Sequence, residues 1–102
     1  MRAARWYRRR GWKVLDHNRW LAGAELDLVV RRGRVLAFVE VKSKSGVGFG
    51  DPFEMVTPVK IARIRRATEV WLRLHPELNG LQVRFDVIAE RASKIEHLPH
   101  AF

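Results

Sequence analysis

Alternating apolar and polar positions predict a β-hairpin in the first half of the chain. From Ala24 to Val30 the apolar residues recur at every second position, and Val35 to Val41 is a β-branched and aromatic run of similar length. The residues between these two runs include a glycine, which favours a tight turn. We therefore expect two antiparallel strands joined by a two-residue turn at Arg32-Gly33.

The segments on either side of this hairpin predict two helices and further strands. Thr57-Pro58 is typical of a helix start, because threonine caps the first turn and proline fits its first position. The helix that follows has apolar residues near helical spacing and is expected to end before Pro76. The expected elements are a helix over 1–10 that stops at Gly11, a short strand from Trp12 that turns at Asp16 to Asn18, the hairpin, a helix from Pro58 to about Leu74, a strand over 82–89 and an edge strand over 94–98.

This order of elements predicts an α/β fold. Helices placed before and after a run of strands, with one long helix crossing over to a later strand, give a three-layer sandwich. Its mixed sheet is expected to contain about four to five strands, in an order that the pattern does not determine. A chain of 102 residues is long enough for one core, so residues 1–102 are expected to form a single domain. Ser43 to Asp51, rich in glycine and serine, is expected to be a mobile loop.

Charge narrows the classes of partner. The formal net charge is +9, and such a field concentrates polyanions around a protein, nucleic acid first and an anionic membrane second. The alternative is a solvated basic surface that binds no partner. With no cysteine the chain has neither disulfides nor a thiolate metal site, and with no apolar run of membrane length we expect a cytoplasmic protein that acts alone or as a homodimer.

Four polar residues break the apolar pattern of the predicted hairpin. Side chains alternate along a strand, so Glu25 and Asp27 should share one face of the first strand, and Glu40 and Lys42 one face of the second. A turn at Arg32-Gly33 would place Glu25 opposite Glu40, and all four groups would then project from one face. A three-residue loop would put the two sets on opposite faces, so this inference depends on the register.

Three carboxylates on one face predict a divalent cation. Like charges that lie close together repel, and a cation removes that cost. Carboxylate oxygens suit Mg²⁺ or Mn²⁺, and we expect Asp27, Glu40 and Glu25 as metal ligands. With Lys42 beside them, the set supplies what phosphodiester hydrolysis needs, a metal and a cation near the attacked phosphate. The alternative interpretation is an ion pair on a solvated sheet face, with Glu25 as a surface partner of Lys42.

Several motifs resemble a known family. Asp27 followed by Glu40-Val41-Lys42 is similar to the signature of the PD-(D/E)xK nuclease superfamily, which includes restriction enzymes and archaeal-type Holliday junction resolvases. The wider set of motifs looks like the YraN-like group, also called UPF0102, and covers nearly the whole chain. Those motifs are Gly23-Ala24-Glu25-Leu26-Asp27-Leu28, Phe38-Val39-Glu40-Val41-Lys42, Phe49-Gly50-Asp51-Pro52, Val56-Thr57-Pro58-Val59-Lys60, Arg84-Phe85-Asp86-Val87 and His97-Leu98-Pro99-His100-Ala101-Phe102.

The resemblance implies an endonuclease-like sandwich with a metal-dependent active site. It makes Asp27 and Glu40 metal ligands and Lys42 the catalytic lysine. Relatives commonly carry a glutamate in the first helix, whereas Met1 to Lys13 contains no acidic residue. Either the chain begins downstream of that residue, or Glu25 takes its place, or the site is weakened.

Other polar and aromatic residues have more than one interpretation. Lys44, Lys60 and Arg63 are expected to bind nucleic acid; Lys60 lies in a first helical turn, where the macrodipole disfavours a cation unless an anion is near, although a solvated lysine is equally consistent. Most of the four tryptophans are expected in the core rather than stacked on bases. Asp86 is expected to pair with an arginine, and His97 and His100 to be structural or exposed rather than zinc ligands.

Two functions from different classes follow. The first is an endonuclease that uses Mg²⁺ or Mn²⁺ to hydrolyse DNA phosphodiester bonds, with branched or structured DNA implied by the resemblance. The second is a non-catalytic nucleic-acid-binding module that keeps the nuclease fold. Membrane association ranks last, because no helix shows a clean apolar face with interfacial anchors.

Overall fold

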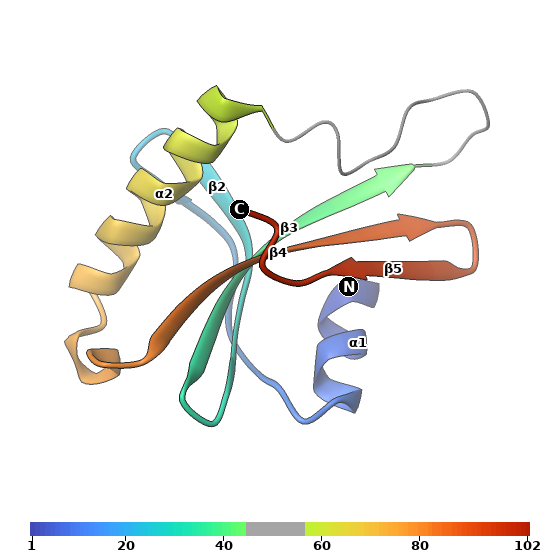
Figure 1. Cartoon of the computed structure of the whole chain (residues 1–102), viewed down its shortest axis with the longest axis horizontal. Coiled ribbons are helices and arrows are strands. Elements are labelled where there is room, and N and C mark those ends of the chain that lie inside the picture. Colours follow the sequence, from blue (N-terminus) through green and yellow to red (C-terminus); the bar gives the residue numbers. More distant parts are fainter. Residues whose placement is uncertain (45–56) are drawn as a thin grey trace.

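A computed structural model describes residues 1–44 and 57–102 as an α/β structure (Figure 1). Most of the expected loop, together with the motif Phe49 to Pro52, lies outside the described residues. No helix in the described part of the chain is long and apolar enough to cross a bilayer. The elements are α1 (Arg2–Arg9), β1 (Lys13–Leu21), β2 (Ala24–Arg32), β3 (Val35–Lys44), α2 (Pro58–Arg73), the short 3₁₀ helix η2 (Pro76–Leu78), β4 (Gln82–Arg91) and β5 (Lys94–Leu98).

The strands form one mixed sheet in the order β1-β2-β3-β4-β5. Neighbouring strands are antiparallel except for β3 and β4, which run parallel from the pair Val35 and Gln82 to the pair Lys44 and Arg91. A parallel pair needs a crossover connection, and α2 lies within that connection. The expected α/β class and mixed sheet are confirmed.

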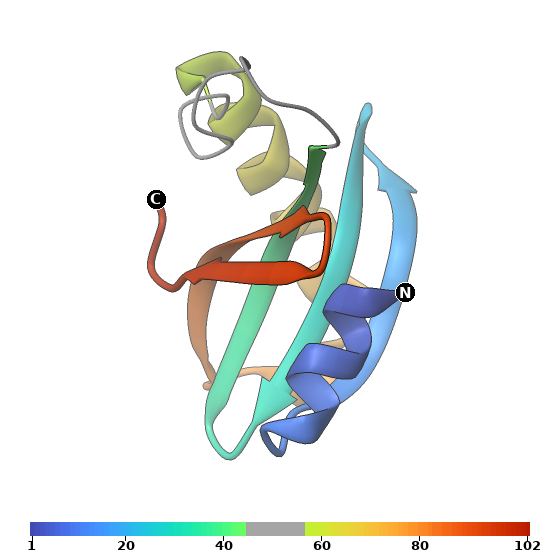
Figure 2. The same cartoon turned by 90° about the vertical axis from the view of Figure 1, so that its right-hand side faces the viewer.

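The two helices cover opposite faces of the sheet, which gives three layers (Figures 1 and 2). On one face, Ala3, Ala4 and Tyr7 of α1 pack with Leu28 and Val30 of β2 in one buried cluster. On the other face, a second buried cluster joins α2 to the sheet; its members include Ile64, Ala67 and Trp71 of α2 and Val29, Leu36 and Phe38 of the hairpin. The sheet therefore has a buried core on both sides.

Local signals explain the helix boundaries. The side chain of Thr57 accepts a hydrogen bond from the backbone N–H of Lys60 at 3.2 Å, which satisfies one amide that the first turn leaves unpaired. After α1, Gly11 has a φ of +86°, a conformation that glycine adopts without the strain a side chain would add. The predicted start of the second helix and stop of the first are confirmed.

The hairpin turn and the first strand differ from the prediction. Arg32 pairs with Val35, so the two turn residues are Gly33 and Arg34 rather than Arg32 and Gly33. Gly33 has a φ of +60° and occupies the first turn position, which is where a type II′ turn places glycine. β1 also continues through the segment expected to turn, because a register shift between Val14 and Asp16 lets the strand bend without ending.

Candidate functional site

β2 and β3 separate at the end of the hairpin that lies away from its turn. Their backbone pairing runs from Arg32 and Val35 to Leu28 and Val39, and one residue further along the same register Asp27 is level with Glu40. There the Asp27 carboxylate accepts a hydrogen bond from the backbone N–H of Val41 at 2.8 Å. Since a side chain now occupies the amide of β3, Asp27 is fixed between the two strands at the opening.

Strict alternation does not explain how the carboxylates meet. Leu26 packs with the cluster on the α2 face, whereas Leu28 packs with the cluster on the α1 face, so the pattern of β2 changes sides around Asp27. Asn18, which the β1 register places level with Asp27, has a φ of +48°. Glu25, Asp27 and Glu40 nevertheless line one pocket, and Lys42 pairs with Glu40, so the four polar groups meet although β2 does not alternate strictly.

Glu40 is the centre of an ion-pair group on the α2 face. Its Oε1 atom lies 3.1 Å from Nζ of Lys42 on the same strand and 2.7 Å from Nζ of Lys60 in the first turn of α2. The Glu40 side chain is only 8% exposed, so both contacts form in a poorly hydrated place. Two lysines thus share one carboxylate oxygen.

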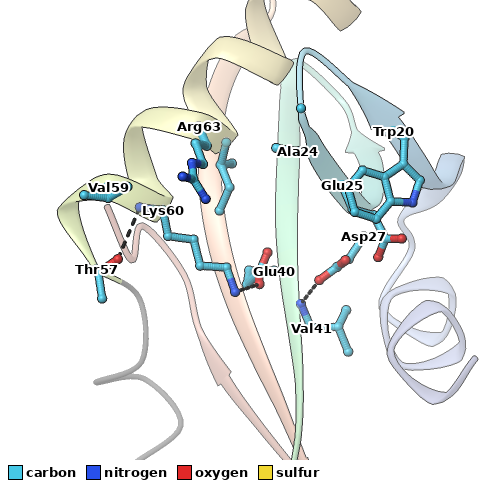
Figure 3. Close-up of a pocket in the computed structure, with 12 residues that line it drawn as sticks. Trp20, Ala24, Glu25, Asp27, Glu40, Val41, Thr57, Val59, Lys60 and Arg63 are labelled. Atoms are coloured by element: carbon cyan, nitrogen blue, oxygen red, sulfur yellow. Dashed lines mark hydrogen bonds and ion pairs between the residues drawn. The ribbon is translucent and has the colours of Figure 1, made fainter.

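These groups line one pocket of about 570 Å³ between α2 and the sheet (Figure 3). Asp27 and Glu40 lie in it with Glu25, while Lys60 and Arg63 face them from α2. The remaining lining residues come from the β1-β2 turn region, β3 and the start of α2. The pocket therefore presents acidic groups on the strands to basic groups on the helix.

The pKa of Asp27 is raised from 3.8 to about 7. Burial is the main cause, the hydrogen-bonded Glu25 adds to it, and the hydrogen bond from Val41 opposes it. The negative charge of Glu40 raises the pKa further. A neighbouring cation would relieve this accumulation of carboxylates.

The two lysines shift in opposite directions. Burial and the neighbouring Lys60 lower the pKa of Lys42, although Glu40 opposes the change. Burial also lowers the pKa of Lys60, but the hydrogen bonds to Glu40 and Lys42 and the negative charges of Glu40 and Asp27 together outweigh that effect, and the pKa is raised. Lys42 is therefore the lysine that gives up its proton more readily.

The residues predicted to form the site are brought together in part. Asp27, Glu40 and Glu25 line the pocket, Lys42 pairs with Glu40, and Glu25 lies beside Asp27 rather than pairing with Lys42. Lys60 pairs with Glu40 while its side chain stays 38% exposed, and its contact with a phosphate stays a prediction. Lys44 ends β3 and its side chain lies outside the description.

The sequence prediction missed the link between α2 and the hairpin. Its only signal was Lys60, a cation in a helix turn that contains no acidic residue. The structure supplies the missing anion, Glu40 of β3, at 2.7 Å. The prediction placed most of the four tryptophans in the core and did not single out Trp20, which lines the same pocket.

The donor set of the pocket suits a hard divalent cation. Within the described residues no three Asp, Glu or His side chains are gathered closely enough to form a metal site by themselves. Mg²⁺, however, is commonly held by one or two carboxylates that are completed by water and substrate phosphate. Asp27 and Glu40 supply two such carboxylates, and because burial, Glu25 and Glu40 raise the pKa of Asp27, a cation at this position would favour its charged form.

A second polar cluster, on the α1 face, is structural. Asp86 is fully buried and accepts hydrogen bonds from the Tyr7 hydroxyl at 2.9 Å and from Nε of Arg84 at 2.8 Å. His97 Nε2 lies 2.8 Å from the same carboxylate, and the backbone N–H of His100 donates to it at 3.3 Å. The expected Asp86–arginine pair is confirmed; the His97 side chain contacts the same carboxylate, whereas His100 is exposed and contributes its backbone.

The outer side of α1 is strongly basic. Arg2, Arg5, Arg9 and Arg10 surround a smaller pocket of about 260 Å³ that also includes Trp6. The guanidinium of Arg10 lies 3.8 Å from the centre of the Trp6 ring. None of these arginines pairs with an acidic side chain among the described residues. This surface is suited to phosphate groups.

The fold and pocket define a class of small α/β proteins in which a mixed sheet presents carboxylates and a lysine to a basic helix. The chain belongs to the uncharacterised protein family UPF0102, whose model matches residues 1–89. The UPF0102 protein of Beutenbergia cavernae is 43% identical and covers 94% of this chain and 85% of the relative. That of Syntrophotalea carbinolica is 44% identical, over 98% of this chain and 84% of the relative. The family resemblance expected from the motifs is confirmed.

Proposed function

We propose that this protein is a metal-dependent endonuclease that hydrolyses DNA phosphodiester bonds in the pocket formed by Asp27, Glu40 and Lys42. The observation that carries the proposal is the meeting of two carboxylates and a lysine where β2 and β3 separate. The similarity of the UPF0102 motifs to the PD-(D/E)xK signature, which gives these residues the same roles, supports it.

Asp27 and Glu40 would hold the metal, with Glu25 as a further oxygen donor beside Asp27. When bound, Mg²⁺ or Mn²⁺ polarises a phosphate oxygen and lowers the pKa of a bound water. The half-buried Asp27 keeps its orientation through the hydrogen bond from Val41, so no ordering of this ligand is needed on binding. Glu40 is held in place by its two lysines in the same way.

Lys42 has two tasks in this proposal. Because burial and Lys60 lower its pKa, a larger fraction of Lys42 is neutral than of an ordinary lysine, and the neutral amine would accept a proton from the attacking water. The ammonium that results would then stabilise the charge that develops on the attacked phosphate. Lys60 and Arg63, on the opposite wall, would bind the phosphate oxygens.

Binding would depend on the phosphate backbone rather than on base sequence. The net charge of +9 and the arginines of α1 provide many phosphate contacts, and no element of the chain resembles a base-reading motif. A preference for branched or structured DNA comes from the resemblance to junction resolvases. The expected contact of Lys44 with nucleic acid rests on the sequence alone and stays a prediction.

Cleavage assays test the proposal. Linear, nicked and four-way DNA are incubated with the protein in Mg²⁺, in Mn²⁺ and in a chelator, and Lys42→Ala is the matched variant. We expect cleavage that requires metal and that Lys42→Ala abolishes. A wild-type protein that binds no divalent cation in a calorimetric titration would overturn the mechanism.

The second candidate is a nucleic-acid-binding module without catalysis. It is favoured by the ion pairs of Glu40, because Lys42 and Lys60 already neutralise the carboxylate that a metal would need. In that case the lysines stabilise the fold and the basic surfaces alone bind DNA. Metal titration separates the two functions, since the module should bind DNA equally well in a chelator and show no saturable Mg²⁺ site.

A further inference from the structure

Trp20 differs from the other tryptophans in its exposure. Trp20 is 68% exposed, whereas Trp12 and Trp71 are only 5% and 0% exposed. A large aromatic group left in water loses the stabilisation that burial would give it, so this position is not explained by the core. Trp20 lies at the edge of the 570 Å³ pocket, next to Glu25 and Asp27 (Figure 3).

The backbone holds this tryptophan firmly. Trp20 pairs with Glu25, and Leu21 pairs with Ala24 across the turn between β1 and β2. The two turn residues, Ala22 and Gly23, have φ values of +50° and +79°, as in the tight hairpin turns whose twist matches that of the strands. Leu21 and Ala24 also pack into the cluster beneath α2. The ring is therefore presented from an anchored strand end.

The surroundings of Trp20 indicate the chemistry of its ligand. Across the pocket lie Lys60 and Arg63, both cationic and both on the helix that faces the hairpin. A ligand that satisfies both sides has a flat apolar ring joined to an anionic group. A nucleotide has this form, since its base stacks on aromatic rings and its phosphate pairs with basic side chains.

We propose that Trp20 stacks on an unpaired nucleobase whose neighbouring phosphate is bound by Lys60 and Arg63, so that the pocket favours strands with unpaired nucleotides over continuous duplex. In a continuous duplex both faces of each base are covered by its neighbours, and a tryptophan finds a base face only at an end, a branch or a single strand. The inference rests on the proposed function for its nucleic-acid partner. It requires no cleavage.

A fluorescence titration without metal tests the inference. Wild type, Trp20→Phe and Trp20→Ala are titrated in a chelator with a short single strand and with a closed duplex of the same sequence that has no free ends. The single strand should quench the tryptophan emission of the wild type, and most of that quenching should disappear in Trp20→Phe. Trp20→Ala should weaken single-strand binding by about 5- to 100-fold, the range expected for one stacked base, and leave duplex binding within about twofold.

A matched control separates stacking from a general loss of apolar surface. Leu74→Ala removes another exposed apolar side chain, which is 54% exposed at the far end of α2. This variant should bind the single strand and the duplex as the wild type does. Equal losses on single strand and duplex in Trp20→Ala, or quenching that persists in Trp20→Phe, would overturn the inference. So would a Trp20-dependent dimer in sedimentation, because a second copy of the chain would then be what covers the ring.

The outcomes for the two proposals are distinguishable. A protein that cuts DNA with metal but binds single strands equally well without Trp20 keeps the nuclease proposal and loses this one. A protein that never cuts but shows Trp20-dependent quenching by single strands keeps this inference and loses the catalytic proposal.

Discussion

Asp27 and Val41 form the contact that opens the hairpin, because the Asp27 carboxylate accepts the backbone N–H of Val41 at 2.8 Å in place of a strand carbonyl. This contact fixes the carboxylate even though its pKa is raised to about 7 by burial and by Glu25. The fold therefore disfavours the charged form of Asp27, and ionisation of this carboxyl lowers the stability of the folded protein. The cost is measurable.

Asp27→Asn should stabilise the metal-free protein at neutral and alkaline pH. The asparagine oxygen still accepts the Val41 hydrogen bond, whereas the charge is gone. Between about pH 4 and pH 7 the folded chain binds more protons at Asp27 than the unfolded chain, so wild-type stability should fall as the pH rises through this window. Solvent screens the partly exposed group, and we expect a gain of about 1 to 2 kcal/mol at pH 8.

Thermal unfolding at pH 5 and pH 8 measures this effect. The two proteins should differ at pH 8 and converge at low pH, while the variant should lose any stabilisation by Mg²⁺. Glu69→Gln, which removes an exposed carboxylate of α2, is the control and should behave as wild type at both pH values. An Asp27→Asn protein that is less stable than wild type at pH 8 would contradict the assignment.

Lys42→Ala and Lys60→Ala should separate chemistry from binding. Lys42 has the lowered pKa, so its removal should reduce single-turnover cleavage by at least about 100-fold and change DNA affinity by less than about twofold. Lys60→Ala should weaken binding more and slow the reaction less, because Lys60 keeps its proton and faces the proposed phosphate. Equal effects of the two variants on the cleavage rate would contradict the division of roles.

Asp86→Asn should destabilise the fold without acting on the pocket. Burial raises the pKa of Asp86, but the hydrogen bonds from His97, Arg84 and Tyr7 outweigh it and hold the pKa at about 2. Removing the charge leaves Arg84, which is largely buried, without its anion, and we expect a loss of about 2 to 4 kcal/mol. Tyr7→Phe, which removes one hydrogen bond, should cost about 1 kcal/mol.

Acid unfolding provides the pH test of the same cluster. A depressed pKa contributes stability that is present above about pH 4 and lost as the pH falls toward 2. Wild type should therefore lose stability steeply in this window, and Asp86→Asn should show a shallower dependence from a lower starting value. Urea titrations at pH 5, 4, 3 and 2 give the comparison, and parallel curves for the two proteins would contradict it.

Removing two arginines from α1 should change the salt dependence of DNA binding. Each phosphate contact that is lost lowers the slope of log affinity against log salt by about 0.9, so Arg5→Ala with Arg9→Ala should lower it by about 2. Arg73→Ala is the control. Arg73 lies in the last turn of α2, on the opposite face of the sheet from α1, and it already contacts Glu69. A slope that both variants change equally would remove α1 from the binding surface.

The sequence predicts the elements well because most signals are local. Thr57-Pro58 and Gly11 mark helix ends through the chemistry of one or two residues, and the structure places those ends accordingly. The turn at Gly33 was misplaced by one residue, since glycine suits either position of a hairpin turn and only the strand pairing decides. That shift brings Asp27 level with Glu40 instead of Phe38.

The contents of the pocket depend on tertiary structure and were harder to predict. The pair of Lys60 with Glu40 needs α2 to cross the sheet and bring β4 parallel to β3, and no local pattern encodes that order of strands. The change of face around Asp27 lies level with Asn18 on the neighbouring strand, whose φ is +48°, and no local pattern predicted either feature. The sequence singled out the acidic residues and Lys42 because strand positions normally hold apolar side chains, and the structure places Glu25, Asp27 and Glu40 in one pocket with Lys42 paired to Glu40.

The parallel contact between β3 and β4 has a kinetic consequence. Strands β1, β2 and β3 need only short turns to pair, so Asp27, Glu40 and Lys42 meet through contacts that are close in sequence and form fast. β4 pairs with β3 in parallel across a long stretch of intervening sequence, and parallel pairing of strands distant in sequence is slow. Lys60 arrives with that second event. Until then β3 has an unpaired edge and Glu40 lacks one of its two cations, so folding should be limited, and aggregation favoured, by the step that brings α2 onto the sheet.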